Sequence, residues 1–154
     1  MAQIFRAKKR VVDKQAIEVK IHSLDHQGRG VASYQGKVCF VDGALANEQI
    51  KAQITHNKAK FLEAKMLKVI TPSDERVIPF CQHNDVCGGC QMQHLALSAQ
   101  LQHKQQAVDK LFSKFTQQTA LNWQAAIESD STHYRRSARI ASFYDKTAQS
   151  LKLG

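Results

Sequence analysis

The stretch Ala16-Ile-Glu-Val-Lys-Ile-His22 alternates apolar and polar residues, and this alternation decides the fold of the first half of the chain. Successive side chains of an extended strand point to opposite faces, so Ile17, Val19 and Ile21 are expected to share one face. Three later stretches repeat the alternation, and glycines separate them, which is typical of short β-strands. They are Lys37-Val-Cys-Phe-Val41, Glu48-Gln-Ile-Lys-Ala-Gln-Ile-Thr55 and Phe61-Leu-Glu-Ala-Lys-Met-Leu-Lys-Val69.

Four or five short strands without a helix between them predict a small, OB-like β-barrel over residues 12–71. A closed barrel is the natural arrangement because closure removes the exposed edges of the sheet. The turn-rich segment Thr71-Pro-Ser-Asp-Glu-Arg76 then predicts a domain boundary.

Residues 72–154 predict a second, α+β domain with a different pattern. An apolar stripe ending at Phe115 predicts a helix, for which Ser98 is the candidate N-cap. Because the last residues resemble the second strand of a hairpin turning at Asp145-Lys-Thr147, we expect this domain to be incomplete. Its expected parts are a cysteine loop at 79–94, a helix over about 98–115 and a strand over about 134–144.

The composition points to a polyanionic partner. The 154 residues carry a net charge of +9 with a pI near 9.6, which is typical of nucleic-acid binding. No apolar run approaches the ~20 residues of a membrane span, and the N-terminus has no apolar segment of the secretory type. We therefore expect a cytoplasmic protein, in which clustered cysteines bind metal more often than they form disulfides.

Three of the four cysteines lie in Cys81-Gln-His-Asn-Asp-Val-Cys87-Gly-Gly-Cys90. Thiolates suit zinc or an iron–sulfur cluster, and the glycine pair lets the backbone bend around one point. Such sites take four ligands, so one is missing from this run. His83, His94 and Cys39 are candidates, although Cys39 lies in an expected strand and fits a small buried apolar residue better. We expect the fourth ligand to be a cysteine beyond Gly154.

A second motif, Asp25-His-Gln-Gly-Arg-Gly-Val-Ala32, predicts a tight turn that presents Arg29 between two strands. No helix follows it, so the motif does not indicate a dinucleotide fold. On a basic barrel the turn favours contacts with nucleic-acid phosphates, and an ordinary hairpin with a solvated arginine is the alternative. The candidate nucleic-acid-binding residues of this half are Arg29, Lys37, Lys58 and Lys60, with added charge from Arg6, Lys8, Lys9 and Arg10.

A third motif is Tyr134-Arg-Arg-Ser-Ala-Arg-Ile140. In a strand, Arg135 and Arg139 would share one face and bind phosphates, while Tyr134 could stack on a base. A solvated sheet face is the alternative.

Taken in order, these motifs resemble the bacterial ribosomal RNA (uracil-5-)-methyltransferases. The resemblance rests on Asp25-x-x-Gly28-x-Gly30-Val31, Pro79-x-Cys81-x5-Cys87-Gly-Gly-Cys90-x-x-Gln93-His94 and Tyr134-Arg-Arg-x-Ala-Arg139. The cysteine loop is its most specific part. Having both the barrel and this loop favours the type that modifies a uridine in 23S RNA of the large subunit.

The resemblance implies that the barrel is an RNA-binding TRAM domain and that Cys81, Cys87 and Cys90 are ligands of a [4Fe-4S] cluster. It also implies a Rossmann-like domain that binds S-adenosylmethionine and supplies the catalytic cysteine and base. No position of this chain matches that domain, so no catalytic or S-adenosylmethionine-binding residue is assigned here. We therefore expect a monomer that binds unfolded or single-stranded large-subunit RNA and does not methylate it alone.

Two rival functions come from other classes. A stand-alone RNA-binding module with a zinc-knuckle-like cysteine site would need no enzyme, and its metal would be zinc rather than iron. An iron–sulfur electron carrier would need four ligands in a compact frame and gives the basic barrel no role.

Overall fold

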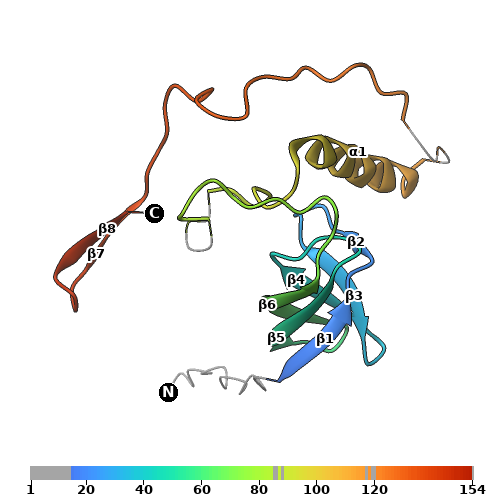
Figure 1. The fold of residues 1–154 in the computed structure, drawn as a ribbon, viewed down its shortest axis with the longest axis horizontal. Helices are drawn as coiled ribbons and strands as arrows, with labels where there is room; N and C mark the ends of the chain where they lie inside the picture. The colour runs from blue at the N-terminus through green and yellow to red at the C-terminus, as the bar shows by residue number, and fades with distance from the viewer. Residues whose placement is uncertain (1–14, 85–86, 88, 117, 119–120, 154) are drawn as a thin grey trace, which may run out of the picture. The chain divides into compact units, whose positions relative to one another are not determined.

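A computed structural model of the chain describes residues 15–84, 87, 89–116, 118 and 121–153 (Figure 1). The chain divides into two compact units, Met1–Asp74 and Glu75–Gly154. The domain limits expected from the sequence, residues 12–71 and 72–154, stay predictions beside this division. Gly88 and the basic residues Arg6, Lys8, Lys9 and Arg10 lie outside the described residues.

The first unit is a six-stranded sheet, in keeping with the period-two pattern of its sequence. The strand order is β1-β5-β6-β4-β3-β2, and all neighbours are antiparallel except β4 and β6, which run parallel (Figure 1). The strands are β1 (Ala16–Lys20), β2 (Ser23–Leu24), β3 (Gly30–Tyr34), β4 (Lys37–Asp42), β5 (Gln49–Asn57) and β6 (Phe61–Thr71).

One face of this sheet forms the hydrophobic core. The alternation seen in the sequence sends every second residue inward, as in β1, where Ile17 and Val19 are buried and their neighbours exposed. Cys39 is fully buried in the same cluster, as expected for a small apolar residue. The core residues are Ile17, Val19, Ile21, Ala32, Cys39, Val41, Ala44, Ile50, Ala52, Ile54, Leu62 and Ala64.

The sheet curls, but the described strands do not show a closed barrel. β1 and β2 stand at the two ends of the strand order. The residues after β1 nevertheless reach across: Ile21 N–H donates to Glu48 O at 2.9 Å, and His22 N–H donates to Val31 O at 2.8 Å. The second of these bonds joins the end of β1 to β3, near the opposite edge of the sheet.

The two glycines of the Gly-x-Gly motif serve different purposes. Gly28 has a φ of 77°, a conformation that side chains other than glycine rarely adopt, and it forms the turn. Gly30 is buried, and a Cβ there would lie 2.9 Å from Ala44 Cβ and 3.1 Å from Ile21 Cγ2. Gly30 therefore permits close packing rather than a turn.

In the second unit, the cysteine loop is closed at its base by backbone hydrogen bonds. Val77 N–H donates to His94 O and Ala96 N–H donates to Glu75 O, each at 2.9 Å. Helix α1 (Leu97–Ser113) follows directly and confirms the expected helix. Ala96, not Ser98, is its N-cap residue, and no side chain caps this end of the helix.

A two-stranded hairpin, β7 (Ser142–Asp145) and β8 (Ser150–Leu153), ends the described part of the second unit. The Asp145 Oδ1 accepts hydrogen bonds from Thr147 N–H at 3.0 Å and Ala148 N–H at 3.1 Å, so the expected turn is confirmed. The strand expected over about 134–144 begins only at Ser142. Residues 134–141 have no ladder partner among the described residues, and a strand is stable only when its backbone groups are paired.

Candidate nucleic-acid surface and cysteine loop

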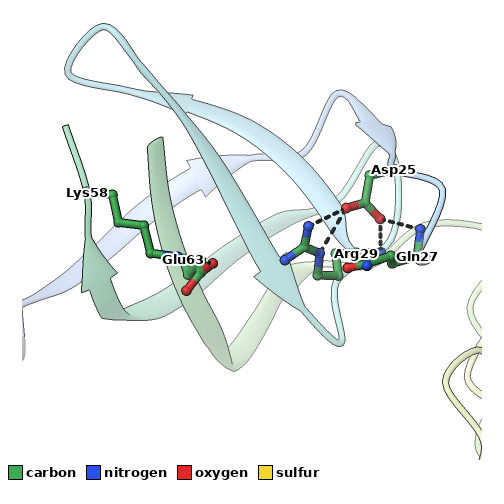
Figure 2. Close-up of polar contacts among 5 residues, drawn as sticks. All are labelled: Asp25, Gln27, Arg29, Lys58 and Glu63. Atoms are coloured by element: carbon green, nitrogen blue, oxygen red, sulfur yellow. Dashed lines mark hydrogen bonds and ion pairs between the residues drawn. The ribbon is translucent and has the colours of Figure 1, made fainter. Parts of the chain in front are cut away.

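The turn between β2 and β3 is organised by one carboxylate, that of Asp25 (Figure 2). Its Oδ1 accepts hydrogen bonds from the backbone N–H groups of Gln27 and Arg29, both at 2.9 Å. Its Oδ2 accepts a hydrogen bond from Arg29 Nε at 2.8 Å and lies 2.8 Å from Arg29 Nη2. The predicted RNA-binding residue Arg29 is therefore fixed in direction and is not a freely solvated side chain.

Arg29 lies over an aromatic ring that sequence reasoning had not selected. Its Cζ is 4.6 Å from the centre of the Phe40 ring. The Phe40 ring meets Phe61 edge to face, with centres 5.8 Å apart, and Lys58 Nζ lies 4.6 Å from the centre of the Phe61 ring. These four residues, in the order Arg29, Phe40, Phe61 and Lys58, are called the aromatic–cation row below.

The pairing of β4 with β6 builds this row. Phe40 alternates with the buried residues Cys39 and Val41, and Phe61 precedes the buried Leu62, so both rings lie on the outer face. In the parallel register Val38 is opposite Phe61 and Phe40 is opposite Glu63. The signal in the sequence is that each phenylalanine stands at a position where the alternation calls for a polar residue.

Glu63 anchors the lysine end of the row. Lys58 Nζ donates to Glu63 Oε1 at 3.0 Å, and His56 Nδ1 lies 3.1 Å from Glu63 Oε2. The hydrogen bond from Lys58 is the main cause that holds the pKa of Glu63 below its ordinary value. The positive charges of Lys58, His56 and Arg29 lower that pKa further, so the carboxylate interacts electrostatically with the cations at both ends of the row.

The other predicted basic residues of the first unit differ in their surroundings. Lys37 Nζ donates to Asn57 Oδ1 at 2.9 Å and to Lys58 O at 3.0 Å, so it supports the turn between β5 and β6. Lys60 is exposed in the same turn.

The predicted RNA-binding residues of the second unit, Tyr134, Arg135 and Arg139, are all exposed. Arg135 Cζ lies 5.8 Å from the centre of the Tyr134 ring, and Arg135 Nη2 donates to Tyr134 Oη at 3.4 Å. Arg139 lies four residues further along the same irregular segment. The shared face expected for Arg135 and Arg139 required a strand, and this part of the prediction is wrong because the strand begins at Ser142.

All four cysteines are free thiols in this structure. In the loop, Cys81 N–H donates to the side-chain Oε1 of Gln93 at 3.1 Å, and Cys87 N–H donates to His83 O at 2.8 Å. A Cβ at Gly89 would lie 3.4 Å from Cys87 Sγ, which is an ordinary van der Waals distance. The loop is thus folded back on itself, with Cys87 and Cys90 exposed.

The chemistry of these thiols fits a thiolate-bound metal or cluster, but the structure does not gather them into a site. Among the described residues, no set of three His, Cys, Asp or Glu side chains could hold a metal ion. Of the alternative ligands, His83 is exposed and His94 is buried. Burial in the core of the first unit raises the pKa of the Cys39 thiol, which disfavours the thiolate that a metal requires.

Comparison with known proteins identifies relatives of both units. Residues 11–67 match the family model described as the TRAM domain. The 23S rRNA (uracil(1939)-C(5))-methyltransferase RlmD of Pseudoalteromonas translucida is 51% identical over the whole chain, which covers 35% of that protein. The protein of the same name from Shewanella sp. (strain ANA-3) is 45% identical, again over the whole chain and over 34% of its own length.

A conserved protein of Methanococcus maripaludis, known from a solution structure, is 33% identical over 44% of this chain and all of that protein, with a TM-score of 0.35.

Among the described residues no helix is long and apolar enough to cross a membrane. The resemblance predicted from the sequence is confirmed by the two methyltransferases: along its whole length the chain is related to 23S rRNA (uracil-C5)-methyltransferases of the RlmD type, and it spans about a third of their length.

Proposed function

We propose that this chain is the RNA-binding and iron–sulfur part of an S-adenosylmethionine-dependent 23S rRNA uridine C5-methyltransferase. The observation that carries the proposal is the 51% identity to an RlmD protein over all 154 residues. The TRAM match over residues 11–67 supports RNA binding by the first unit, for which we propose a closed, OB-like barrel.

The charges of the chain support the same function. The net charge of +9 favours a polyanion, and the first unit presents Arg29, Lys58 and Lys60 together with two aromatic rings. We propose that these residues, with Lys37 supporting their turn, contact the phosphates of unfolded large-subunit RNA. Tyr134, Arg135 and Arg139 are the proposed contacts of the second unit.

The role of this chain in methyl transfer is to bind and orient the RNA. S-adenosylmethionine would supply the methyl group in the complete reaction, and no residue of this chain is assigned to that step. Unpaired RNA offers bases that can be taken out of a stack, which a reaction at uracil C5 requires. The cations and rings of the first unit suit this task because they bind backbone and bases without requiring a duplex.

We propose further that Cys81, Cys87 and Cys90 bind a [4Fe-4S] cluster. Two facts support this: the thiols are free, and they lie in one loop closed at its base. The cluster would supply covalent cross-links within the loop and, with no redox change of the substrate, a structural role. The structure does not show the thiols gathered, so loading must draw them together.

Metal analysis tests the cysteine assignment. We expect the anaerobically purified chain to absorb near the blue end of the visible spectrum and to contain iron and sulfide, with a loss of both in Cys87→Ser. Cys39→Ser, which alters a core thiol, should keep the iron. Stoichiometric zinc without iron would instead support an RNA-binding module with a zinc knuckle.

RNA binding tests the main proposal. We expect the chain to bind a fluorescein-labelled single-stranded RNA with an affinity that falls steeply as salt rises. Absence of binding at low salt would overturn the proposed function whatever metal the loop contains.

A further inference from the structure

Two carboxylates lie directly against the two cations of the aromatic–cation row (Figure 2). Asp25 holds Arg29 at one end, and Glu63 holds Lys58 at the other. A carboxylate beside an RNA-binding cation repels phosphate, so on charge alone each of them should weaken binding. Their contacts with the cations favour the opposite effect, which is tighter binding of RNA.

Asp25 fixes both the turn and the arginine that the turn carries. It accepts two backbone hydrogen bonds with Oδ1 and contacts Arg29 Nε and Nη2 with Oδ2. Of the five N–H groups of the guanidinium, this contact uses those of one edge, and Arg29 Cζ lies 4.6 Å from the centre of the Phe40 ring. The side chain of Asp25 is only 9% exposed, whereas that of Arg29 is 27% exposed, so the cation faces solvent more than its anchor does.

The lysine end repeats the arrangement with different residues. Glu63 follows Phe61 by two positions in β6, so its side chain lies on the same face of the sheet as the ring. Lys58 Nζ is 3.0 Å from Glu63 Oε1 and 4.6 Å from the centre of the Phe61 ring. The two rings meet edge to face with their centres 5.8 Å apart, so the two fixed cations belong to one continuous surface.

We infer that Asp25 and Glu63 are positioning residues, which hold Arg29 and Lys58 over Phe40 and Phe61 so that the row binds single-stranded RNA. A cation held in place loses less side-chain entropy when it binds a phosphate. The guanidinium plane and the rings also offer stacking surfaces, which unpaired bases can reach and the bases of a duplex cannot. This inference rests on the proposed RNA-binding function and specifies the substrate class and the residues that recognise it.

The test asks whether removing a carboxylate weakens or strengthens RNA binding. Asp25→Asn and Glu63→Gln each remove one negative charge, as does the control Glu18→Gln on the exposed face of β1. The affinity of the full chain for a labelled twelve-nucleotide oligouridylate is measured at several salt concentrations. We expect the two row variants to bind roughly two- to fivefold more weakly, the size of one lost cation–π arrangement. Their slope of log affinity against log salt should flatten by about 0.7 per lost phosphate contact, while the control binds as well as the original chain or better.

Tighter or unchanged binding by both row variants would overturn the inference, because the carboxylates would then act only as opposing charges. Phe40→Leu provides an independent reading, since it keeps an apolar side chain but removes the ring beneath Arg29. It should weaken oligouridylate binding as Asp25→Asn does, with an unchanged far-ultraviolet circular dichroism spectrum. Normal binding by Phe40→Leu also counts against the row.

The same measurements separate this inference from the function on which it rests. If the original chain binds no RNA, both fail. If it binds oligouridylate but the row variants bind equally well, RNA binding stands and the row is excluded. Equal affinity for a twelve-base-pair RNA duplex would overturn the preference for single strands.

Discussion

Gly30 shows how one residue without a side chain determines the packing of the first unit. Its Cα faces Ala44 and Ile21, both fully buried, at a separation that leaves no room for a methyl group. The neighbouring Gly36 is different, since no atom lies within 4 Å of its missing Cβ but its φ is +74°. The same amino acid is thus required for space at one position and for backbone conformation at the other.

Substitution of Gly30 by alanine should lower the free energy of unfolding by about 1–3 kcal/mol, because the core must move to accept the methyl group. Gly36→Ala should lower it by about 1–2 kcal/mol through backbone strain alone. Urea denaturation measures both. The added substitution Ala44→Gly should restore part of the loss in Gly30→Ala and none in Gly36→Ala. Equal effects of Ala44→Gly in the two backgrounds would show that contact with Ala44 is not the cause.

At the scale of secondary-structure elements, the strands were predictable and their pairing was not. The period-two pattern located β1, β4, β5 and β6 because each buries one face. The parallel pairing of β4 with β6 could not be predicted, since it requires β5, which separates them along the chain, to lie on the far side of β6 in the sheet. The row was missed for this reason: Phe40 and Phe61 become neighbours only through that pairing.

The second unit shows where local pattern fails. The apolar stripe predicts α1 correctly, but it points to Ser98 as the N-cap because the sequence alone does not reveal the hydrogen bond from Ala96 N–H to Glu75 O. The alternation after Tyr134 predicted a strand that begins only at Ser142. A pattern fixes which face a strand would bury, but a partner is needed to form it.

The hydrogen bond between Lys58, in the turn between β5 and β6, and Glu63 of β6 should make the stability of the first unit depend on pH. The pKa of Glu63 lies below its ordinary value of 4.5, first because of the hydrogen bond from Lys58. A carboxyl whose pKa is lower in the folded than in the unfolded chain stabilises the fold above its unfolded pKa. That contribution is lost as the pH falls through the folded pKa, so it should disappear progressively below pH 4.5.

Glu63→Gln removes this titration. We expect the difference in unfolding free energy between the original chain and Glu63→Gln to be largest near neutral pH and to shrink in acid. Chemical denaturation at a series of pH values measures it. A difference that stays constant, or grows in acid, would contradict the assigned cause of the pKa shift.

At the scale of the whole molecule, both units contribute basic residues to an excess of 22 Lys and Arg over 13 Asp and Glu. The cysteine loop could be proposed as a ligand site from sequence because its ligand types and spacing lie within a few residues, and this stays a prediction. The geometry of that loop could not be predicted, because the positions of three thiols around a bound metal would depend on the metal as well as on the chain.

Salt dependence should reveal whether the second unit touches RNA. Replacing both Arg135 and Arg139 by alanine should flatten the plot of log affinity against log salt by about one to two units, as expected for two lost phosphate contacts. Lys152→Ala is a suitable control, because Asp145 already lies 2.6 Å from that ammonium group and neutralises it. An unchanged slope in the double variant would mean that these arginines do not contact phosphate.

The order of the strands also has a consequence for synthesis on the ribosome. Among the strands of the described residues β1 is made before the others, and its partner β5 begins at Gln49, roughly thirty residues after Lys20. At about 5–20 residues per second, β1 therefore waits roughly 2–6 seconds before its ladder can form. During that time Ile17 and Val19 cannot be buried against β5, and the nascent chain is open to association with its neighbours on a polysome. Only the arrival of β5 ends this exposure.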